Sequence, residues 1–138
     1  MTLQPMCLGS ANHHMVDQTA RTAPAFRDVA LVKAAHEEYL TVLSKAEEHL
    51  GKTGGPYIVG KTLSVGDIPL AVELNRWSLC VHRARADGIS LGCPALPHLD
   101  RYYAAMVGMP AYAEHVHAAE RKHQALDESD EVRCLPQP

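Results

Sequence analysis

The chain has 138 residues, of which 46% are hydrophobic and 21% charged, as expected for a single globular domain. Its formal net charge is −3 with both signs interspersed, so no basic stripe could neutralise a run of phosphates, and we expect no nucleic-acid partner. No stretch of about 18 apolar residues could span a bilayer, and the N-terminal residues lack the pattern of a signal peptide, so we expect neither membrane insertion nor export.

The first clear element is a long amphipathic helix over residues 28–50. Side chains of its apolar face recur at alternating steps of three and four: Val29, Val32, His36, Tyr39, Leu43, Ala46 and Leu50. The stretch "GKTGGP", residues 51–56, should stop this helix because its glycines allow left-handed conformations and its proline lacks a backbone donor. A tight turn at residues 57–59 should follow.

The next helix has a strongly specified start. Ser64 can accept a hydrogen bond from a backbone N–H of the first turn, while Asp67, three residues later, can accept from the N–H of Ser64. This pattern is a capping box with aspartate in the position of the usual Glu or Gln. Leu63 and Ile68 have the spacing of a hydrophobic staple around it.

The helix that follows, over residues 64–84, is apolar nearly all round, which predicts a buried central helix. Leu74 and Trp77 should lie in its buried part. Pro69 should cost the hydrogen bond to the carbonyl of Val65, so we expect a slight kink there.

Two shorter helices are expected after residue 93, separated by a break at Gly108 and a restart after Pro110. Tyr102 and Tyr103 are adjacent and face different sides of the first of them, so we expect at most one of the two in the core. No convincing strand pattern occurs. The acidic, proline-ended tail has no periodicity and is predicted to be disordered.

These motifs carry a family resemblance. "YIVGKTLSVGDIPLAVELNRW", residues 57–77, resembles the glutathione transferase segment in which an aromatic-and-glycine turn precedes a Ser/Thr and then an Asp at the start of a buried helix. "PALPHLDRYYAAMVGMPAYAEHV" resembles the family's later proline, leucine, aromatic and Pro-Ala-Tyr pattern. "ARTAPAFRDVALVKAAHEEYLTVLSKAEEHL" resembles the long helix of bacterial members. The resemblance covers about residues 21–118.

The resemblance implies an all-α fold, a glutathione transferase C-terminal-like helical bundle with four to five helices around a buried central helix. Residues 1–20 are then a remnant of the first helix or a disordered N-terminus, residues 21–125 the helical domain, and residues 126–138 a disordered acidic tail. In the family a thioredoxin-like domain precedes this region and holds glutathione. Nothing in the chain resembles that domain, so we interpret the chain as the helical half of a glutathione transferase, truncated and inactive alone.

The resemblance also suggests a residual substrate-binding groove near Met15, Arg76 and Trp77, because the family's helical half contributes a wall of the electrophile pocket. An aromatic residue at helical spacing is more often a core residue, and for Arg76 the alternative is a surface side chain with an exposed head. We expect no catalytic residue in the chain. Glutathione is the family's substrate, and its site is expected to be absent here.

Histidines and cysteines offer further candidates. His117, Glu120 and His123 can share one helical face, but three surface ligands lack a visible fourth, so we expect no metal. His36 should be a hydrogen-bonded core histidine and Cys80 a small buried hydrophobe. The four cysteines have no two-residue spacing, which favours a reducing, cytoplasmic setting over a disulfide framework.

Two classes of function remain open. One is a glutathione transferase-type protein that depends on a thioredoxin-like domain, as a homodimer or in association with that domain. The other is a non-catalytic helical protein-interaction module, since domains that resemble this one also serve as assembly units. The electrophile and the transferase subclass do not follow from the sequence.

Overall fold

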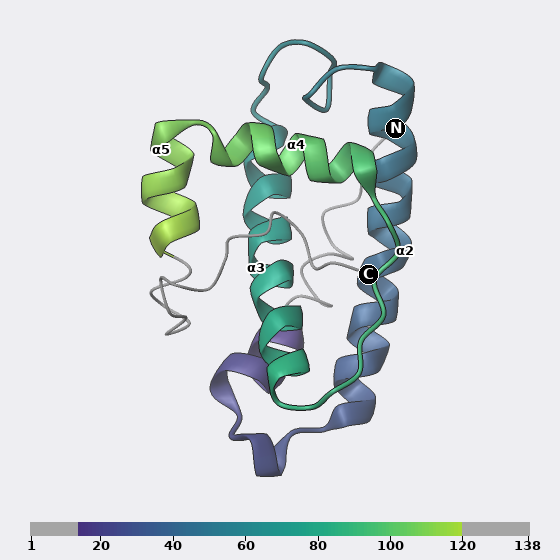
Figure 1. Ribbon diagram of the computed structural model, residues 1–138, viewed down its shortest axis with the longest axis vertical. Helices are drawn as coiled ribbons and strands as arrows, with labels where there is room; N and C mark the ends of the chain where they lie inside the picture. Colours follow the sequence, from purple (N-terminus) through teal and green to yellow (C-terminus); the bar gives the residue numbers. More distant parts are fainter. Residues whose placement is uncertain (1–13, 120–138) are drawn as a thin grey trace.

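The computed structural model describes residues 14–119, and these residues are helical without a named strand. Helices α2 (Val29–Thr53) and α3 (Asp67–Ala86) run side by side in opposite directions, and α4 (Pro97–Val107) crosses over the end where the chain passes from α2 to α3 (Figure 1). The short α5 (Pro110–Tyr112) continues into a π-helical turn, η3 (Ala113–His117). The predicted all-α class is therefore confirmed.

The N-terminal part of the described chain is also helical. Residues 14–16 lead into the π-helical turn η1 (Asp17–Arg21), and a 3-10 turn, η2 (Pro24–Phe26), precedes α2. Of the segment 1–20, residues 1–13 lie outside the described residues, as does the tail 126–138 for which disorder was predicted.

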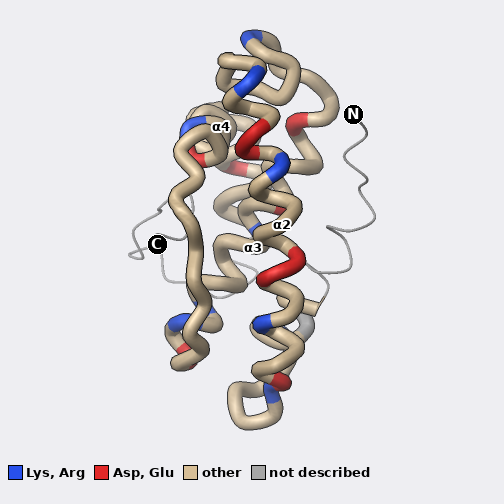
Figure 2. The backbone as a smooth tube through the Cα atoms, turned by 90° about the vertical axis from the view of Figure 1, so that its right-hand side faces the viewer, with Lys and Arg blue, Asp and Glu red and all other residues tan. Residues whose placement is uncertain are grey.

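Helix α2 begins and ends as its sequence dictates. Asp28 is the N-cap, and its Oδ1 accepts a hydrogen bond from the N–H of Leu31 at 3.0 Å. The helix ends at Gly54, which has a φ of 68° in the left-handed region that favours glycine. Its predicted apolar face is buried from Val32 to Leu50, whereas Val29 at its start is exposed. Charges of both signs occur along the two long helices (Figure 2).

Helix α3 forms the centre of the bundle. Leu74 and Trp77 are both fully buried, as predicted for the middle of this helix. The helix begins at Asp67 rather than at Ser64, with Gly66 in the N-cap position. Pro69 is then the third helical residue, where no intrahelical partner exists for the missing N–H, so the reason to expect a kink disappears. Within the described residues, no helix is long and apolar enough to cross a membrane.

The start of α4 is capped from a distant part of the chain. Pro97 takes the first helical position, and the free N–H groups of His98 and Leu99 donate to the two carboxylate oxygens of Glu47 on α2, at 2.9 and 2.7 Å. One turn further along α2, Gly51 lies against the His98 ring, where a Cβ would come within 3.2 Å. Glu47 thus fixes where α4 crosses α2.

Three tyrosines join the later helices to one stripe of α3. The hydroxyl of Tyr102 donates to the carbonyl of Asp67 at 2.7 Å, and that of Tyr112 donates to the carbonyl of Ala71 at 2.6 Å. The hydroxyl of Tyr103 donates to Oδ1 of Asn75 at 2.5 Å. The three acceptors are four residues apart and therefore lie above one another on α3.

The prediction that at most one of Tyr102 and Tyr103 is in the core is wrong. Both are buried. Their neighbouring positions do point in different directions on α4, but this helix is packed on several sides, with contacts to α2, α3, α5 and η3. A helix covered on several sides can bury adjacent residues, provided that their hydroxyls find acceptors.

We expect Glu47→Ala to lower the free energy of unfolding by about 1 to 3 kcal/mol, because two backbone donors at the start of α4 lose their acceptor. The measurement is urea denaturation followed by circular dichroism. Glu48→Ala is the matched control, since Glu48 is an exposed residue whose partner is Lys52 at 2.6 Å. Equal effects of the two substitutions would contradict the capping role of Glu47.

Candidate functional site

The buried carboxylate of Asp67 accepts three hydrogen bonds. Its Oδ2 accepts from the N–H of Ser64 at 2.7 Å and from the Ser64 hydroxyl at 2.9 Å, and its Oδ1 accepts from the N–H of Ile58 at 2.9 Å. Asp67 is 0% exposed. A fully buried carboxylate needs such donors, because they replace the water that it loses on burial.

The capping box is confirmed in one half and wrong in the other. Asp67 accepts from the N–H of Ser64, as predicted. The Ser64 hydroxyl, however, donates to Asp67 instead of accepting from the first turn. The physical reason is that the Asp67 N–H already bonds the Ser64 carbonyl at 3.1 Å in a tight turn, and regular α-helix starts only afterwards.

The staple contact between Leu63 and Ile68 stays a prediction. With Gly66 at the N-cap, the positions of a staple shift to Val65 and Leu70. Leu63 and Ile68 are each exposed to a large extent.

We expect Asp67→Ala to lower the free energy of unfolding by about 1 to 3 kcal/mol, since it leaves the backbone donors of Ile58 and Ser64 without an acceptor. Asp67→Asn should cost less because its amide oxygen still accepts one of these bonds. Thermal melts of both variants and of Ser64→Ala, which keeps the Ser64 N–H, provide the comparison. An unchanged melting temperature for Asp67→Ala would show that this carboxylate does not hold the start of α3.

The predicted substrate-binding residues are placed in different surroundings. Trp77 is fully buried in a three-ring stack, with ring centroids 5.7 Å from His36 and 5.4 Å from Tyr39. Met15 is fully buried in the hydrophobic core. Only Arg76 reaches solvent, with its side chain 41% exposed and 3.7 Å from Glu73. The structure therefore presents neither Met15 nor Trp77 to an open surface, and the binding role of the three stays a prediction.

His36 is a core histidine with two hydrogen bonds, as predicted. Its Nε2 donates to the carbonyl of Gly92 at 2.5 Å, and its Nδ1 accepts from the indole N–H of Trp77 at 3.3 Å. This pair of bonds requires the neutral ring with its proton on Nε2. Burial lowers the pKa of His36 below its ordinary value of 6.5, although the bond to Gly92 and the charge of Glu37 act in the opposite direction.

Stability should fall as the pH drops below about 6.5, because the unfolded chain then binds a proton at His36 that the folded chain resists. The stabilising contribution is complete above the unfolded pKa and is lost towards the lower folded pKa. We expect the melting temperature of His36→Gln, which cannot titrate, to depend less on pH between about pH 7.5 and 5.5 than that of the wild type. His115→Gln, at an exposed histidine, is the control. Identical pH profiles for His36→Gln and the wild type would contradict this account.

A buried cluster of three polar side chains, Asn75, Tyr103 and His117, joins α3, α4 and η3. The hydroxyl of Tyr103 donates to Oδ1 of Asn75. Nδ1 of His117 lies 3.2 Å from Oη of Tyr103 and 3.1 Å from Oδ1 of Asn75. Because the Tyr103 proton is already used, the proton in these two contacts is on Nδ1 of His117. His117 is buried, which corrects its assignment to an exposed helix face. Glu120 and His123, its partners in the metal hypothesis, lie outside the described residues. Among residues 14–119 no group of three His, Cys, Asp or Glu side chains could hold a metal ion.

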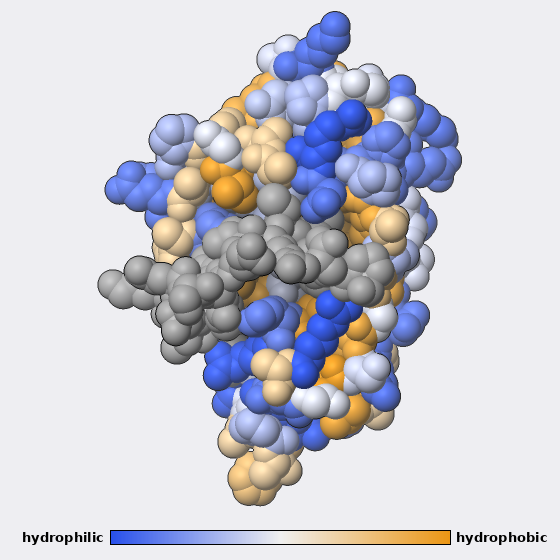
Figure 3. All heavy atoms as spheres, viewed as in Figure 1, coloured by the Kyte–Doolittle hydropathy of each residue, from blue (hydrophilic) through white to orange (hydrophobic). Residues whose placement is uncertain are grey.

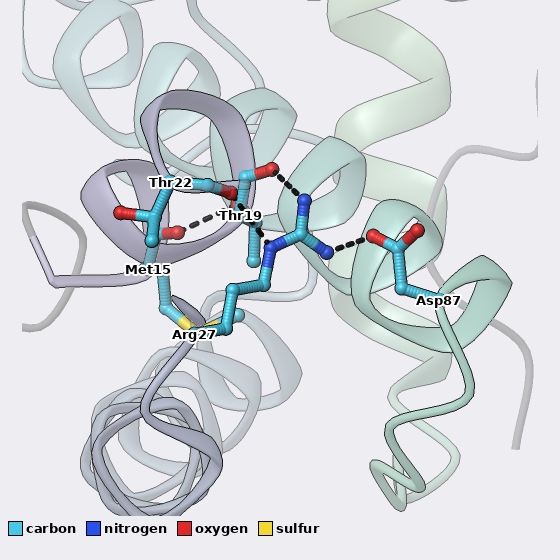
Figure 4. Close-up of polar contacts among 5 residues, drawn as sticks. All are labelled: Met15, Thr19, Thr22, Arg27 and Asp87. Carbon is cyan, nitrogen blue, oxygen red and sulfur yellow. Dashed lines mark hydrogen bonds and ion pairs between the residues drawn. The ribbon is translucent and has the colours of Figure 1, made fainter. Parts of the chain in front are cut away.

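A buried arginine ties the N-terminal turn to the end of α3 (Figure 4). The Arg27 side chain is 3% exposed, and it donates to the carbonyls of Thr22 at 3.0 Å and Thr19 at 2.8 Å while pairing with the Asp87 carboxylate. The Thr19 hydroxyl in turn donates to the carbonyl of Met15 at 2.6 Å. This clamp, which the sequence did not reveal, holds the turn that carries Met15 against the core.

Burial opposes the ionisation of three side chains of the described residues. Burial raises the pKa of Tyr39 and of Tyr102, and it raises the pKa of the Cys93 thiol. Cys80 is fully buried and, like Cys93, forms no disulfide. A nucleophilic cysteine needs the opposite shift, towards the thiolate, so Cys93 does not have the surroundings of an activated nucleophile.

Comparison with known proteins agrees with this geometry. Residues 10–110 match the profile of the glutathione S-transferase C-terminal domain, which is more than half of the chain. The chain therefore belongs to the glutathione S-transferase C-terminal domain family. No curated protein matches the chain significantly.

Proposed function

We propose that this chain supplies the helical half of a glutathione transferase-type protein, and that conjugation of glutathione to an electrophile requires a thioredoxin-like domain in addition. Membership of the C-terminal domain family supports the first part. The second part is supported by the tyrosine hydroxyls, three of which donate hydrogen bonds to α3.

Activation of glutathione needs a hydrogen-bond donor that faces the sulfur and favours its thiolate. Of the five tyrosines of the chain, Tyr39, Tyr102, Tyr103 and Tyr112 are buried. Three of these four hydroxyls donate to α3. The fifth tyrosine, Tyr57, is partly buried in the turn before α3. The use of these hydroxyls to hold the bundle together is the observation that carries the proposal.

The proposed partner is a thioredoxin-like domain or a second copy of this chain, and the proposed location is the cytoplasm. The two cysteines of the described part are free thiols, in keeping with a reducing compartment. A non-catalytic interaction module is the second candidate, favoured by the exposed apolar side chains between α2 and α3.

We expect the purified chain to conjugate glutathione to a chloronitrobenzene electrophile no faster than the uncatalysed reaction. The same chain fused behind a thioredoxin-like domain of the family should show saturable turnover. The assay follows product absorbance at varied glutathione concentration, with the thioredoxin-like domain alone as control. Saturable turnover by the unfused chain would refute the proposal, and a fusion no more active than its isolated thioredoxin-like domain would favour the interaction module.

A further inference from the structure

The segment that joins α3 to α4, residues 87–96, passes beside α2 without helical structure of its own (Figure 1). We call it the connecting segment. Hydrophobic residues are visible at the surface in the lower right of Figure 3, the area in which this segment runs. Arg85 of α3 donates to the carbonyl of Leu91 from Nε at 3.0 Å and from Nη2 at 2.8 Å. His36 of α2 donates to the next carbonyl, that of Gly92, at 2.5 Å.

The His36 ring lies where α2, α3 and the connecting segment meet, and it is 1% exposed. Its Nε2 donates to the segment at Gly92, and its Nδ1 accepts from the indole N–H of Trp77 on α3. A neutral imidazole has one donor and one acceptor and can form both bonds at once. The ring therefore ties α2 to two parts of the chain through two different atoms.

Addition of a second proton would affect these two bonds in opposite ways. The proton would attach to Nδ1, the nitrogen that accepts from Trp77, so that two N–H donors would face each other 3.3 Å apart. Nε2 carries its proton in both states, and its bond to the Gly92 carbonyl becomes charge-assisted and stronger. Acid thus opposes the contact of His36 with α3 and preserves its contact with the connecting segment.

The surroundings of the ring set the pH range of this change. Burial has the largest effect and lowers the pKa of His36 below 6.5. The bond to Gly92 of the connecting segment and the charge of Glu37 on α2 favour the cation, whereas the charge of Arg85 on α3 disfavours it. The ring is therefore neutral at neutral pH and takes up its second proton in mildly acidic solution.

The contact between α2 and α3 depends on long side chains in this region. The backbone of α2 packs closely on that of α4, and the backbone of α3 on those of η1, α4 and η3, whereas α2 and α3 lie further apart. The rings of His36, Tyr39 and Trp77 bridge them. The buried hydroxyl of Tyr39 has no hydrogen-bond partner among residues 14–119, so it would gain one from water if the helices separated.

The opposite end of the two helices is held without His36. There the carbonyl of Ile58 accepts from Nε2 of His49 on α2, while its N–H donates to Asp67 on α3, each at 2.9 Å. Loss of the contact between His36 and Trp77 can therefore part the helices locally, because the loop that connects them stays attached to both.

We propose that His36 is a pH-sensitive latch between α2 and α3: acid releases Trp77 from His36 and parts the two helices there, while the connecting segment stays bound to α2. The latch differs from a general loss of stability at low pH, because it predicts a folded state in which one contact is open. It does not depend on glutathione chemistry, so the conjugation assay and the titration below can fail independently.

The test is two-dimensional NMR of the nitrogen-15-labelled chain, titrated from about pH 7.5 to 4.5. Trp77 is the only tryptophan, so its indole N–H gives one signal. We expect this signal to shift to the position of an indole without a hydrogen bond, with a midpoint below pH 6.5. Its exchange with water should become about tenfold faster or more, while the amide signals of α4 keep their positions.

Two substitutions at histidines of α2 form a matched pair. His36→Gln should hold the indole signal in place over the whole range, because the Gln amide can donate to Gly92 and accept from Trp77 without titrating. His49→Gln is the control, since His49 also donates from Nε2 to a backbone carbonyl, and it should leave the indole titration unchanged. Trp77→Phe removes the opposing donor, so the pKa of His36, measured from its imidazole signals, should rise towards 6.5.

Three results would overturn the proposal. The indole signal stays in place until all signals of the folded chain vanish together, which assigns the effect of His36 to global unfolding. His36→Gln shows the same indole titration as the wild type, which assigns the change to another group. The pKa of His36 is the same in Trp77→Phe, which shows that the indole does not oppose the second proton. The wild-type titration decides by itself where circular dichroism shows that a variant is unfolded.

Discussion

The buried carboxylate of Asp67 is the interaction on which the arrangement of the other elements depends. It is stable without solvent because Ile58 and Ser64 surround it with three donors, and in accepting those bonds it fixes the loop before α3. The carbonyl of the same residue accepts from Tyr102, so the start of α3 also positions α4. One residue thereby connects the loop, the central helix and the helix that crosses it.

Polar groups elsewhere in the core follow the same rule. Glu47 accepts from the start of α4, and His36 and Arg85 hold the segment after α3 through the carbonyls of Gly92 and Leu91. Each is a buried or partly buried side chain whose hydrogen bonds replace those that a short helix or loop cannot make for itself. Side chains committed in this way are poor candidates for chemistry. In the described part of the chain these side chains hold the bundle together.

Much of the fold could be predicted because its signals are local. The apolar period of α2, the left-handed stop at Gly54 and the aspartate before α3 each follow from a few neighbouring residues. The contacts that the sequence did not reveal join distant positions: Glu47 to His98, and Arg27 to Asp87. Glu47 did leave one signal, since it lies four residues after the buried Leu43, beside the apolar stripe of its helix. The candidate site was less predictable, because whether Met15 or Trp77 faces solvent depends on which elements cover it.

The contacts of Trp77 with His36 and Tyr39 have a spectroscopic consequence. Trp77 is the only tryptophan of the chain, and the two rings beside it both come from α2 while it belongs to α3. Its indole emission therefore reports on the contact between α2 and α3. Separation of α2 from α3 would bring the indole into water and shift its emission to longer wavelength even while both helices keep their far-ultraviolet dichroism. The protein thus carries an intrinsic optical label for loss of tertiary packing, distinct from loss of helix.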